Sequence, residues 1–297
     1  LKIAEGCDNF CTYCVIPSLR GRYRSRKIEN IVSEASKLVN SGIKELVLVA
    51  QDTTRYGVDL YGSKKLVDLI QELSKIDGLR WIRLLYCYPE EIDDRLIQEI
   101  KNNSKVCKYI DIPIQHISDK VLKSMGRRGN SQEIKNLIVR LKSEIPEIII
   151  RTTFIVGFPG EDENDFESLC SFVKEAEFDR MGVFMYSREE GTPAFSMDKQ
   201  VDDNLKKERY NKIMEIQYNI AREKNIRRVG HVYDAIVQGV ADDGIFYYGR
   251  TYAEAPDIDG VVYFTSREPL EIGEFCEIKI LSEDEYDLIG EVKYEST

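Results

Sequence analysis

The chain of 297 residues is 42% hydrophobic and 32% charged, and it carries a formal net charge of −10. This apolar fraction suffices for a folded core and, with aromatic and aliphatic residues spread along the whole chain, excludes a disordered protein. No apolar stretch is long enough to span a membrane and the first residues do not resemble a signal peptide, so we expect a cytoplasmic protein.

Strand-like runs alternate with helical periods from the first residue to about residue 186. The chain starts at Leu1, without a methionine, already inside such a run, and we therefore expect it to be part of a longer protein. The expected strands cover residues 1–5, 44–50, 80–86, 108–114, 148–156 and 180–186. Apolar residues at helical spacing mark amphipathic helices near residues 28–39, 66–73 and 134–141. This alternation predicts βα units on a parallel sheet, which either forms an incomplete barrel or opens into a doubly wound sheet.

After these units the alternation of strands and helices ends, and the pattern of apolar residues and turns changes. Residues 201–228 are expected to form one long charged helix. The residues on its expected apolar side are Leu205, Ile213, Ile216 and Ile220. Beyond the helix, Gly/Asp turns separate short strand-like runs at residues 232–240, 245–252, 261–264 and 275–281. Several short strands in so few residues predict a small antiparallel β-barrel, and we expect two domains, residues 1–228 and residues 229–297.

The net charge divides unevenly at this boundary. Residues 1–228 hold 38 Lys/Arg against 36 Asp/Glu, whereas residues 229–297 hold 4 against 16. The acidity thus belongs to the second domain, which would repel the phosphates of a nucleic acid and attract a basic protein. An acidic surface that serves only solubility explains the charge equally well.

Three of the seven cysteines, Cys7, Cys11 and Cys14, stand within eight residues in the loop after the first expected strand. The others are scattered through apolar runs, as buried free thiols usually are: Cys87, Cys107, Cys170 and Cys276. Disulfides would leave one thiol over, and a structural zinc site lacks a fourth ligand nearby in the sequence. An iron–sulfur cluster on three thiolates leaves one iron open to a small molecule, and we favour this interpretation over zinc.

The spacing C-x-x-x-C-x-x-C, with Tyr13 before the last cysteine, resembles the signature of the radical S-adenosylmethionine (SAM) superfamily. The resemblance implies that Cys7, Cys11 and Cys14 hold a 4Fe–4S cluster whose open iron binds the amino and carboxylate groups of SAM. An electron from the cluster would cleave SAM to a 5′-deoxyadenosyl radical, which abstracts a hydrogen atom from the substrate. The implied fold is a partial (βα)6 TIM-like barrel.

Two further segments are similar to the methylthiotransferase family, whose members insert sulfur and a methyl group at a carbon–hydrogen bond. They are residues 16–26 (IPSLRGRYRSR) and residues 186–194 (YSREEGTPA). The family also carries a terminal β-barrel of the TRAM type, which the second domain would be. One branch modifies a tRNA adenosine. Another, the RimO-like branch, modifies the β-carbon of an aspartate in protein twelve of the small ribosomal subunit.

Four local features favour the RimO-like branch. The tRNA-modifying branch usually has Gln-Asn where this chain has Gln51-Asp52, Gln-Ser where it has Gln115-His116, and Arg-Pro where it has Glu189-Glu190. The fourth feature is the acidic segment at residues 249–260, which is typical of the RimO-like branch. A basic ribosomal protein also suits the acidic second domain better than tRNA does. The basic run at residues 20–27 is compatible with a phosphate patch, a substrate contact or a rim of the active site.

The resemblance places SAM-binding residues at the carboxyl ends of the strands. They are Tyr13, Gln51, Asp52, Gln115, Gly157 and Phe158. Structural alternatives are a packing role for Tyr13, a turn or helix cap for Asp52, and a plain strand–helix turn at Gly157. A lone histidine such as His116 is more often a satisfied core group than a catalytic one. The Arg127-Arg128 pair either grips a carboxylate or lies solvated at the surface.

Together these features predict a radical SAM methylthiotransferase of the RimO-like branch, with no catalytic residues beyond the cluster ligands. A tRNA methylthiotransferase and a zinc-containing binding module are the alternatives. The family holds a second cluster on three cysteines of an N-terminal domain, and no second triplet stands in these 297 residues. We therefore expect one 4Fe–4S cluster and SAM on this chain, and no complete methylthiolation by it alone. The electron donor and the sulfur source stay open.

Overall fold

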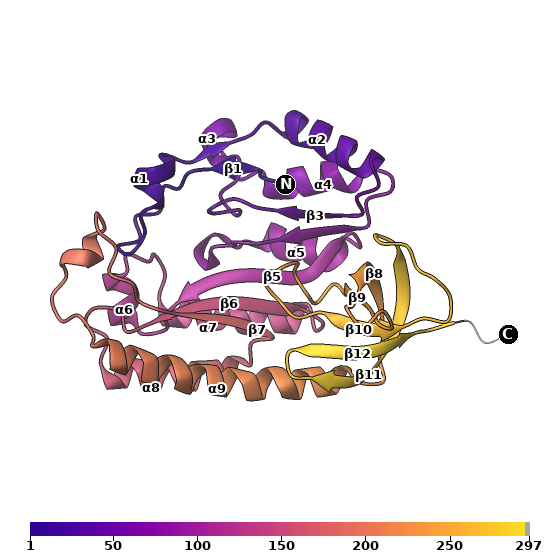
Figure 1. Ribbon diagram of the computed structural model, residues 1–297. Helices are drawn as coiled ribbons and strands as arrows, with labels where there is room; N and C mark the ends of the chain where they lie inside the picture. The colour runs from indigo at the N-terminus through magenta and orange to yellow at the C-terminus, as the bar shows by residue number, and fades with distance from the viewer. Residues whose placement is uncertain (295–297) are drawn as a thin grey trace.

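The computed structural model describes residues 1–294 and contains a five-stranded parallel sheet in the order β3-β4-β5-β6-β7 (Figure 1). Its strands are β3 (Glu45–Leu48), β4 (Trp81–Leu84), β5 (Val106–Gln115), β6 (Ile149–Val156) and β7 (Arg180–Met185). The first expected strand extends the β3 edge in parallel, because Ile3 N donates to Val49 O at 3.0 Å. It continues as β1 (Ala4–Glu5), which pairs with β2 (Arg24–Ser25). The expected series of six parallel runs is confirmed.

The strand order decides between the two folds that the sequence left open. Neighbours in the sheet are neighbours in sequence, so every right-handed crossover places its helix on the same face. A sheet covered on one face curves into a partial barrel, whereas a doubly wound sheet reverses its strand order. The covering helices in Figure 1 are α2 (Ile28–Asn40), α4 (Leu66–Ser74), α5 (Asp94–Asn102), α7 (Ser131–Glu144) and α8 (Glu163–Ala176).

Short helices complete the connections between strands and helices. They are α1 (Ile16–Arg20), α3 (Val58–Tyr61), η1 (Pro89–Glu91), α6 (Asp119–Ser124) and η2 (Pro193–Ser196). Within residues 1–294, no helix has both the length and the apolar composition that crossing a membrane requires.

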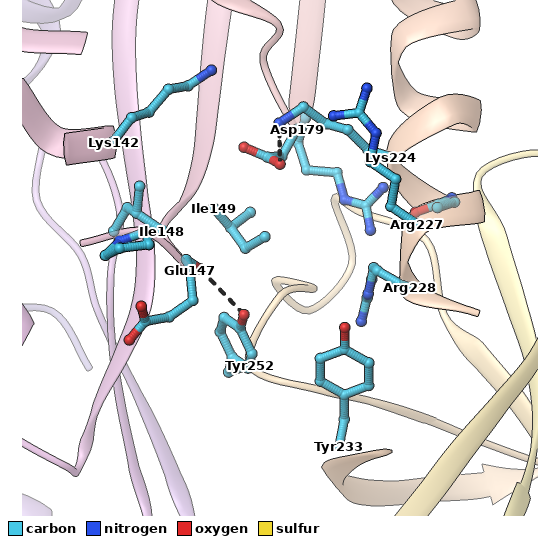
Figure 2. Close-up of a pocket in the computed structure, with 13 residues that line it drawn as sticks. Lys142, Glu147, Ile148, Ile149, Asp179, Lys224, Arg227, Arg228, Tyr233 and Tyr252 are labelled. Carbon is cyan, nitrogen blue, oxygen red and sulfur yellow. Dashed lines mark hydrogen bonds and ion pairs between the residues drawn. The ribbon is translucent and has the colours of Figure 1, made fainter. Parts of the chain in front are cut away.

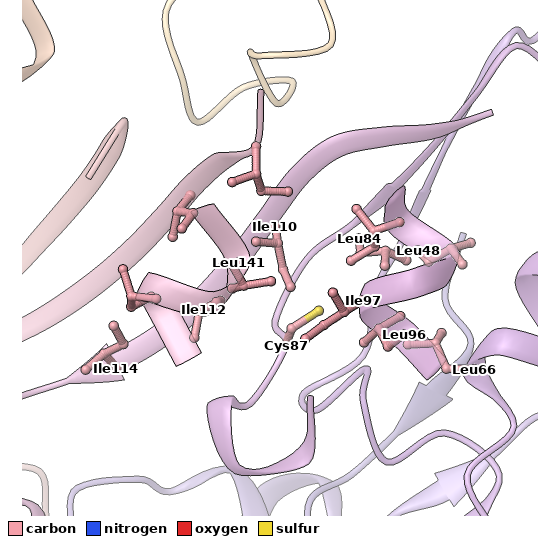
Figure 3. Packing of buried hydrophobic residues seen from close by; sticks show 14 of the residues in the cluster. Leu48, Leu66, Leu84, Cys87, Leu96, Ile97, Ile110, Ile112, Ile114 and Leu141 are labelled. Atoms are coloured by element: carbon pink, nitrogen blue, oxygen red, sulfur yellow. The ribbon is translucent and has the colours of Figure 1, made fainter. Parts of the chain in front are cut away.

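The main core fills the space between the sheet and its covering helices (Figure 3). Leu84 of β4, Ile110 of β5 and Leu141 of α7 are fully buried in one cluster, as the alternation of apolar residues predicts. Cys87 lies among them, also fully buried. Cys107 and Cys170 are buried as well, so these scattered thiols behave as small apolar side chains.

The long helix α9 (Asp203–Arg228) forms where the sequence predicts it, but its inner face differs from the expected one. Of the expected apolar residues only Ile213 is fully buried; Ile216 and Ile220 lie at the margin of the core, and Leu205 is half-buried outside it. The buried residues of α9 are Lys206, Arg209, Ile213, Gln217, Ala221 and Asn225. The polar residues among them form hydrogen bonds or ion pairs with backbone and charged groups. Gln217 Nε2, for example, donates to Phe178 O at 2.9 Å. The helix therefore supplies hydrogen bonds that the ends of its neighbouring elements require.

The remaining strands close into a small barrel in the order β10-β12-β11-β8-β9. They are β8 (Val232–Val240), β9 (Tyr247–Arg250), β10 (Val262–Thr265), β11 (Phe275–Asp284) and β12 (Asp287–Val292). Closure uses one parallel pair, β10 with β12, in an otherwise antiparallel barrel. The sequence did not reveal β12, because acidic residues and a glycine interrupt its apolar alternation.

The connection between β9 and β10 docks this C-terminal barrel against the parallel sheet. Arg83 of β4 is fully buried and donates through Nη1 to Tyr252 O at 2.6 Å. Arg250 Nη2 lies 2.6 Å from Glu45 Oε2, and the other oxygen of that carboxylate accepts from Arg83 Nε at 2.7 Å. These contacts lie at the amino-terminal half of the sheet, opposite the cysteine loop (Figure 1).

The acidic side chains of the docking connection face inward. Glu254 pairs with Arg180 at 3.0 Å and also contacts Arg228, and Tyr109 OH donates to Asp259 Oδ2 at 2.7 Å. The side chains of Glu254 and Asp259 are 1% and 2% exposed. Part of the acidic segment that we took as a feature of the barrel surface is therefore buried between the two parts of the chain.

Candidate functional site

The cysteine loop follows β1 and is held by backbone contacts on two sides. Cys7 N donates to Gly21 O at 3.2 Å. Thr12 donates through its amide to Met125 O at 2.9 Å and through Oγ1 to Ser124 O at 2.8 Å. The loop thus has a defined position at the carboxyl ends of the strands, where active sites of parallel barrels lie.

Gly6, directly before Cys7, gives a first prediction. It has φ = 79°, and a Cβ there would lie 2.2 Å from Arg22 O, a backbone atom. We expect Gly6→Ala to displace the cysteine loop and to lower both stability and iron binding. Gly42→Ala is the matched control, because Gly42 also has positive φ (105°) but nothing lies within 4 Å of its Cβ position.

Urea unfolding and iron content after anaerobic reconstitution check this prediction. Gly6→Ala should lower the free energy of unfolding by about 1–3 kcal/mol more than Gly42→Ala, since steric overlap adds to the conformational cost. Equal losses of stability and iron in the two variants would show that the close approach at Gly6 does not matter.

A cavity of about 370 Å³ opens beside the cysteine loop. Its wall includes Cys7, Cys14, Gln51, Tyr86 and Tyr88. The third thiol is adjacent, because Cys11 Sγ lies 3.6 Å from the Tyr88 hydroxyl. The structure therefore brings the three cysteines and the predicted Gln51 to one place.

The electrostatics of the loop favour a cation. Burial raises the pKa of Cys7 and of Cys14, and the neighbouring Cys11 thiol raises both further. Asp52 adds to the effect on Cys7. Thiolates crowded in a partly buried loop repel one another, and a metal centre relieves that repulsion.

Three thiols are the donor set of a cluster that keeps one metal position open. Within residues 1–294, no three Cys, His, Asp or Glu side chains stand at metal-binding separation, so the sulfurs have to converge when a metal binds. His116 does not offer a fourth ligand for zinc: its Nδ1 accepts from Ser118 N at 3.0 Å and its Nε2 faces Glu161 at 3.5 Å. The donor set therefore fits a three-thiolate cluster better than a structural zinc site.

Two predicted SAM-binding residues, Gln51 and Asp52, have different surroundings. Gln51 lines the cavity, and its buried Oε1 has no hydrogen-bond partner within the described residues. Asp52 is fully buried and accepts from Asn9 Nδ2 at 2.9 Å and from Thr54 Oγ1 at 2.6 Å. Burial raises the pKa of Asp52 despite these bonds. Gln51 is thus available to a ligand, while Asp52 ties the cysteine loop to the end of β3.

Tyr13 and Phe158 lie together behind the cysteine loop. Their ring centroids are 6.4 Å apart at an interplanar angle of 84°, and Phe158 also packs on Tyr186 at 5.2 Å. Gly157 has φ = 72°, and a Cβ there would lie 2.3 Å from Lys206 Cγ. The close approach that this glycine permits is therefore to α9.

Gln115 and His116 end β5 at the same edge of the sheet. Gln115 has φ = 72°, an uncommon conformation for a residue other than glycine, and is partly buried. His116 is fully buried and accepts one hydrogen bond at Nδ1, but its Nε2, 3.5 Å from Glu161 Oε2, has no hydrogen-bond partner within the described residues, so it is a core histidine satisfied at one nitrogen only.

Sequence reasoning missed two residues of the cavity wall, Tyr86 and Tyr88, and left two alternatives open for Arg127. Tyr86 and Tyr88 follow β4, and a Tyr-x-Tyr-Pro run at a strand end was the available signal. Arg127 is buried rather than at the surface, with its guanidinium 4.2 Å from the centre of the Tyr88 ring. Its Nη2 donates to Pro113 O at 2.9 Å, while Nε and Nη1 have no partner within residues 1–294. Arg128 is exposed and pairs with Glu91 at 2.8 Å.

The basic run at residues 20–27 forms ion pairs with nearby acids. Arg22 Nε lies 2.7 Å from Asp8 Oδ1, inside the cysteine loop, and Arg20 pairs with Glu5 at 3.3 Å. These pairs place part of the run beside the cysteine loop, whereas Arg24 and Lys27 are exposed and form no ion pair among the described residues.

A second cavity of about 340 Å³ lies between α9, the amino-terminal end of the sheet and the C-terminal barrel (Figure 2). Figure 2 shows Lys142 and Lys224 on opposite sides of it and Tyr252 below. Lys224 Nζ bonds to Asp179 Oδ1 at 2.8 Å, and Lys142 Nζ donates to the last carbonyls of α8. Lys142 thus stabilises the C-terminus of α8 and Lys224 is paired with Asp179, so both charges have a structural use. None of the predicted site residues lines this cavity.

Comparison with known proteins adds to this geometry. The radical SAM superfamily matches residues 1–173 and the TRAM domain matches residues 229–292. A protein of Acetivibrio thermocellus named "Ribosomal protein uS12 methylthiotransferase RimO" is 62% identical over 297 residues, all of this chain and 66% of the relative. A protein of the same name from Clostridium botulinum (strain Eklund 17B / Type B) is 56% identical over 296 residues, again 66% of its length. The chain thus spans about 66% of the length of these relatives.

Solved structures share the fold at low sequence identity. The radical SAM methyltransferase TsrM from Kitasatospora setae has a TM-score of 0.55 and 20% identity, over 65% of this chain and 38% of that one. Coproporphyrinogen III oxidase (HemN) from Escherichia coli has a TM-score of 0.52 and 12% identity, over 95% of this chain and 66% of that one. With a superfamily match over more than half of its residues and a three-cysteine loop at the mouth of a partial barrel, this chain belongs to the radical SAM superfamily.

Proposed function

We propose that this chain is the catalytic part of a radical SAM methylthiotransferase that adds a methylthio group to the β-carbon of an aspartate in ribosomal protein uS12. The observation that carries the proposal is the three-cysteine loop beside a cavity at the barrel mouth, in a chain 62% identical to a relative of that name. Residues 1–228 would form the radical SAM core and residues 229–297 a TRAM-like domain for substrate recognition.

Cys7, Cys11 and Cys14 would hold one 4Fe–4S cluster, and a second cluster would belong to a preceding domain. With SAM bound, the cluster supplies a radical able to remove a hydrogen atom from the substrate. The family resemblance assigns Tyr13, Gln51, Asp52, Gln115, Gly157 and Phe158 to SAM. Of these only Gln51 lines the cavity, and the close approach at Gly157 is to Lys206. Gln51 has the strongest support, because its buried Oε1 lacks a partner and its side chain lines the cavity. Asp52 would act through Asn9, by which it holds the loop in place.

Arg127 and Tyr88 would stabilise negative charge at this site. The Arg127 side chain is 2% exposed and keeps two nitrogens without partners within residues 1–294. A buried cation favours negative charge nearby, whether on thiolates or on a bound carboxylate. The Tyr88 hydroxyl, 3.6 Å from Cys11 Sγ, is placed to donate a hydrogen bond to a thiolate there.

The partner would be a basic protein that meets exposed carboxylates of the C-terminal barrel. Glu254 and Asp259 do not contribute, because their side chains are buried against the sheet. Exposed acids of the barrel include Asp242, Asp243, Glu268, Glu271 and Glu274. The same charges would repel tRNA, which makes the tRNA-modifying alternative less suitable.

Hydrogen transfer from a labelled substrate tests the proposal. Protein reconstituted with iron and sulfide is mixed with SAM, a reductant and uS12 that carries deuterium on the β-carbon of its aspartates. We expect uS12 to increase the formation of 5′-deoxyadenosine and to place deuterium in it, as measured by mass spectrometry. We expect tRNA not to increase the formation of 5′-deoxyadenosine. Added salt should reduce deuterium transfer from uS12, because salt screens the attraction between its charges and the exposed carboxylates of the barrel. Stimulation by tRNA without deuterium transfer from uS12 would establish the tRNA-modifying alternative.

A further inference from the structure

Tyr86 stands out among the residues of the cavity wall. It follows β4, lines the cavity beside Cys7 and Gln51, and has 49% of its surface exposed. Its backbone is left-handed, with φ = 58°, which is rare for a bulky residue and requires support from surrounding groups. An exposed aromatic held in a strained conformation at the mouth of a reaction cavity indicates a role in contact with what enters it.

Both backbone groups of Tyr86 are anchored. Its amide donates to Asp111 Oδ2 at 2.9 Å, and its carbonyl accepts from Thr53 N at 3.0 Å. The backbone carbonyl of Asp111 also accepts a hydrogen bond from the next amide, Cys87 N, at 2.8 Å. Asp111, in the middle of β5, therefore fixes the turn that presents Tyr86 to the cavity.

Asp111 is in turn connected to the C-terminal barrel. Arg151 Nη1 donates to Asp111 Oδ1 at 2.9 Å, and Arg151 Nε lies 3.6 Å from Asp259 Oδ1. Asp259 is held by Tyr109 OH at 2.7 Å and by Ala255 N at 2.9 Å. The carboxylates of Asp111 and Asp259 are 3% and 2% exposed, so solvent hardly screens this chain of contacts.

We propose that Tyr86 contacts the peptide bearing the target aspartate, and that Asp111, Arg151 and Asp259 are positioning residues that hold Tyr86 for this contact. The proposal rests on the proposed function. SAM is best held by polar groups beside the cluster, such as Gln51, whereas a half-exposed aromatic at the mouth faces the ligand that arrives from solvent. Through Asp259, docking of the barrel that recognises the protein substrate also sets the position of the residue that meets its target peptide.

The test separates binding of the peptide from binding of SAM. Holoenzyme variants Tyr86→Ala and Asp259→Asn are compared in deuterium transfer from labelled uS12 and in the change of the electron paramagnetic resonance spectrum of the reduced cluster on adding SAM. We expect Tyr86→Ala to raise the KM for uS12 about tenfold and Asp259→Asn to raise it in the same direction, with the SAM-dependent spectral change retained. Asp257→Asn is the matched control, because Asp257 is exposed two residues before Asp259.

Other results would overturn the inference. An unchanged KM for Tyr86→Ala would remove Tyr86 from peptide binding, and loss of the SAM-dependent spectrum would assign it to SAM instead. A raised KM in Tyr86→Ala with no effect of Asp259→Asn would refute the positioning chain alone. Absence of deuterium transfer in the unmodified protein would count against the proposed function, and the spectral arm would still report whether Tyr86 affects SAM.

Discussion

Cys11→Ala is expected to abolish cluster binding and cleavage of SAM. With three protein thiolates as the whole donor set, loss of one leaves two, too few to retain the cluster. The unmodified chain should hold roughly four iron atoms after anaerobic reconstitution, the content of one 4Fe–4S cluster. Iron in Cys11→Ala should fall close to zero, with loss of the brown colour and of 5′-deoxyadenosine formation.

Cys276→Ala is the matched control for this prediction. Cys276 is a partly buried free thiol on β11, in the C-terminal barrel, and takes no part in the cysteine loop. This variant should keep its iron and its activity. Retention of four irons by Cys11→Ala would remove Cys11 from the ligand set, and iron near eight in the unmodified chain would contradict a single cluster. Zinc in place of iron would favour the binding-module alternative.

Features encoded by local patterns were predictable from the sequence. The run at residues 232–240 is rich in β-branched and other apolar residues, and it forms β8 over the same residues. The three cysteines could be assigned to one site because eight residues contain them all. Gln51 could be found because it follows a strand, and parallel strands bring their carboxyl ends to one edge.

Features that depend on partners distant in sequence were not predictable. From the sequence, Asp52 could be a helix cap or a SAM ligand. In the structure, Asn9, 43 residues earlier, donates a hydrogen bond to its carboxylate. The acidity of Glu254 suggested a surface position, yet its partner Arg180 comes from β7 of the parallel sheet and makes it an internal group. For Arg127 the sequence left a carboxylate contact and a solvated surface position open, because burial of a guanidinium on a tyrosine ring leaves no periodic pattern. Charge alone thus misplaces residues whose counter-ions arrive only on folding.

Glu254→Gln is expected to destabilise the docked arrangement of the two parts of the chain. Burial alone would raise the pKa of Glu254, but the guanidiniums of Arg228 and Arg180 outweigh it and lower the pKa from an ordinary 4.5 to about 2. Thr251 completes the carboxylate's shell, donating through its amide at 2.9 Å and its hydroxyl at 2.6 Å. Removing one member of a buried ionic group leaves the others uncompensated, so the free energy of unfolding at neutral pH should fall by about 3–5 kcal/mol.

The pH dependence of stability distinguishes Glu254 from an ordinary surface acid. Because its pKa is lower in the folded state, the stabilisation by Glu254 is fully present above pH 4.5 and disappears as the pH falls toward about 2. Urea unfolding should therefore show a loss of about 3 kcal/mol over this interval in the unmodified chain that Glu254→Gln lacks. Glu271→Gln, at an exposed acid of the same barrel, should change stability by less than about 0.5 kcal/mol and keep the acid dependence. Parallel acid profiles for Glu254→Gln and the unmodified chain would mean that the buried contacts of Glu254 do not hold the barrel against the sheet.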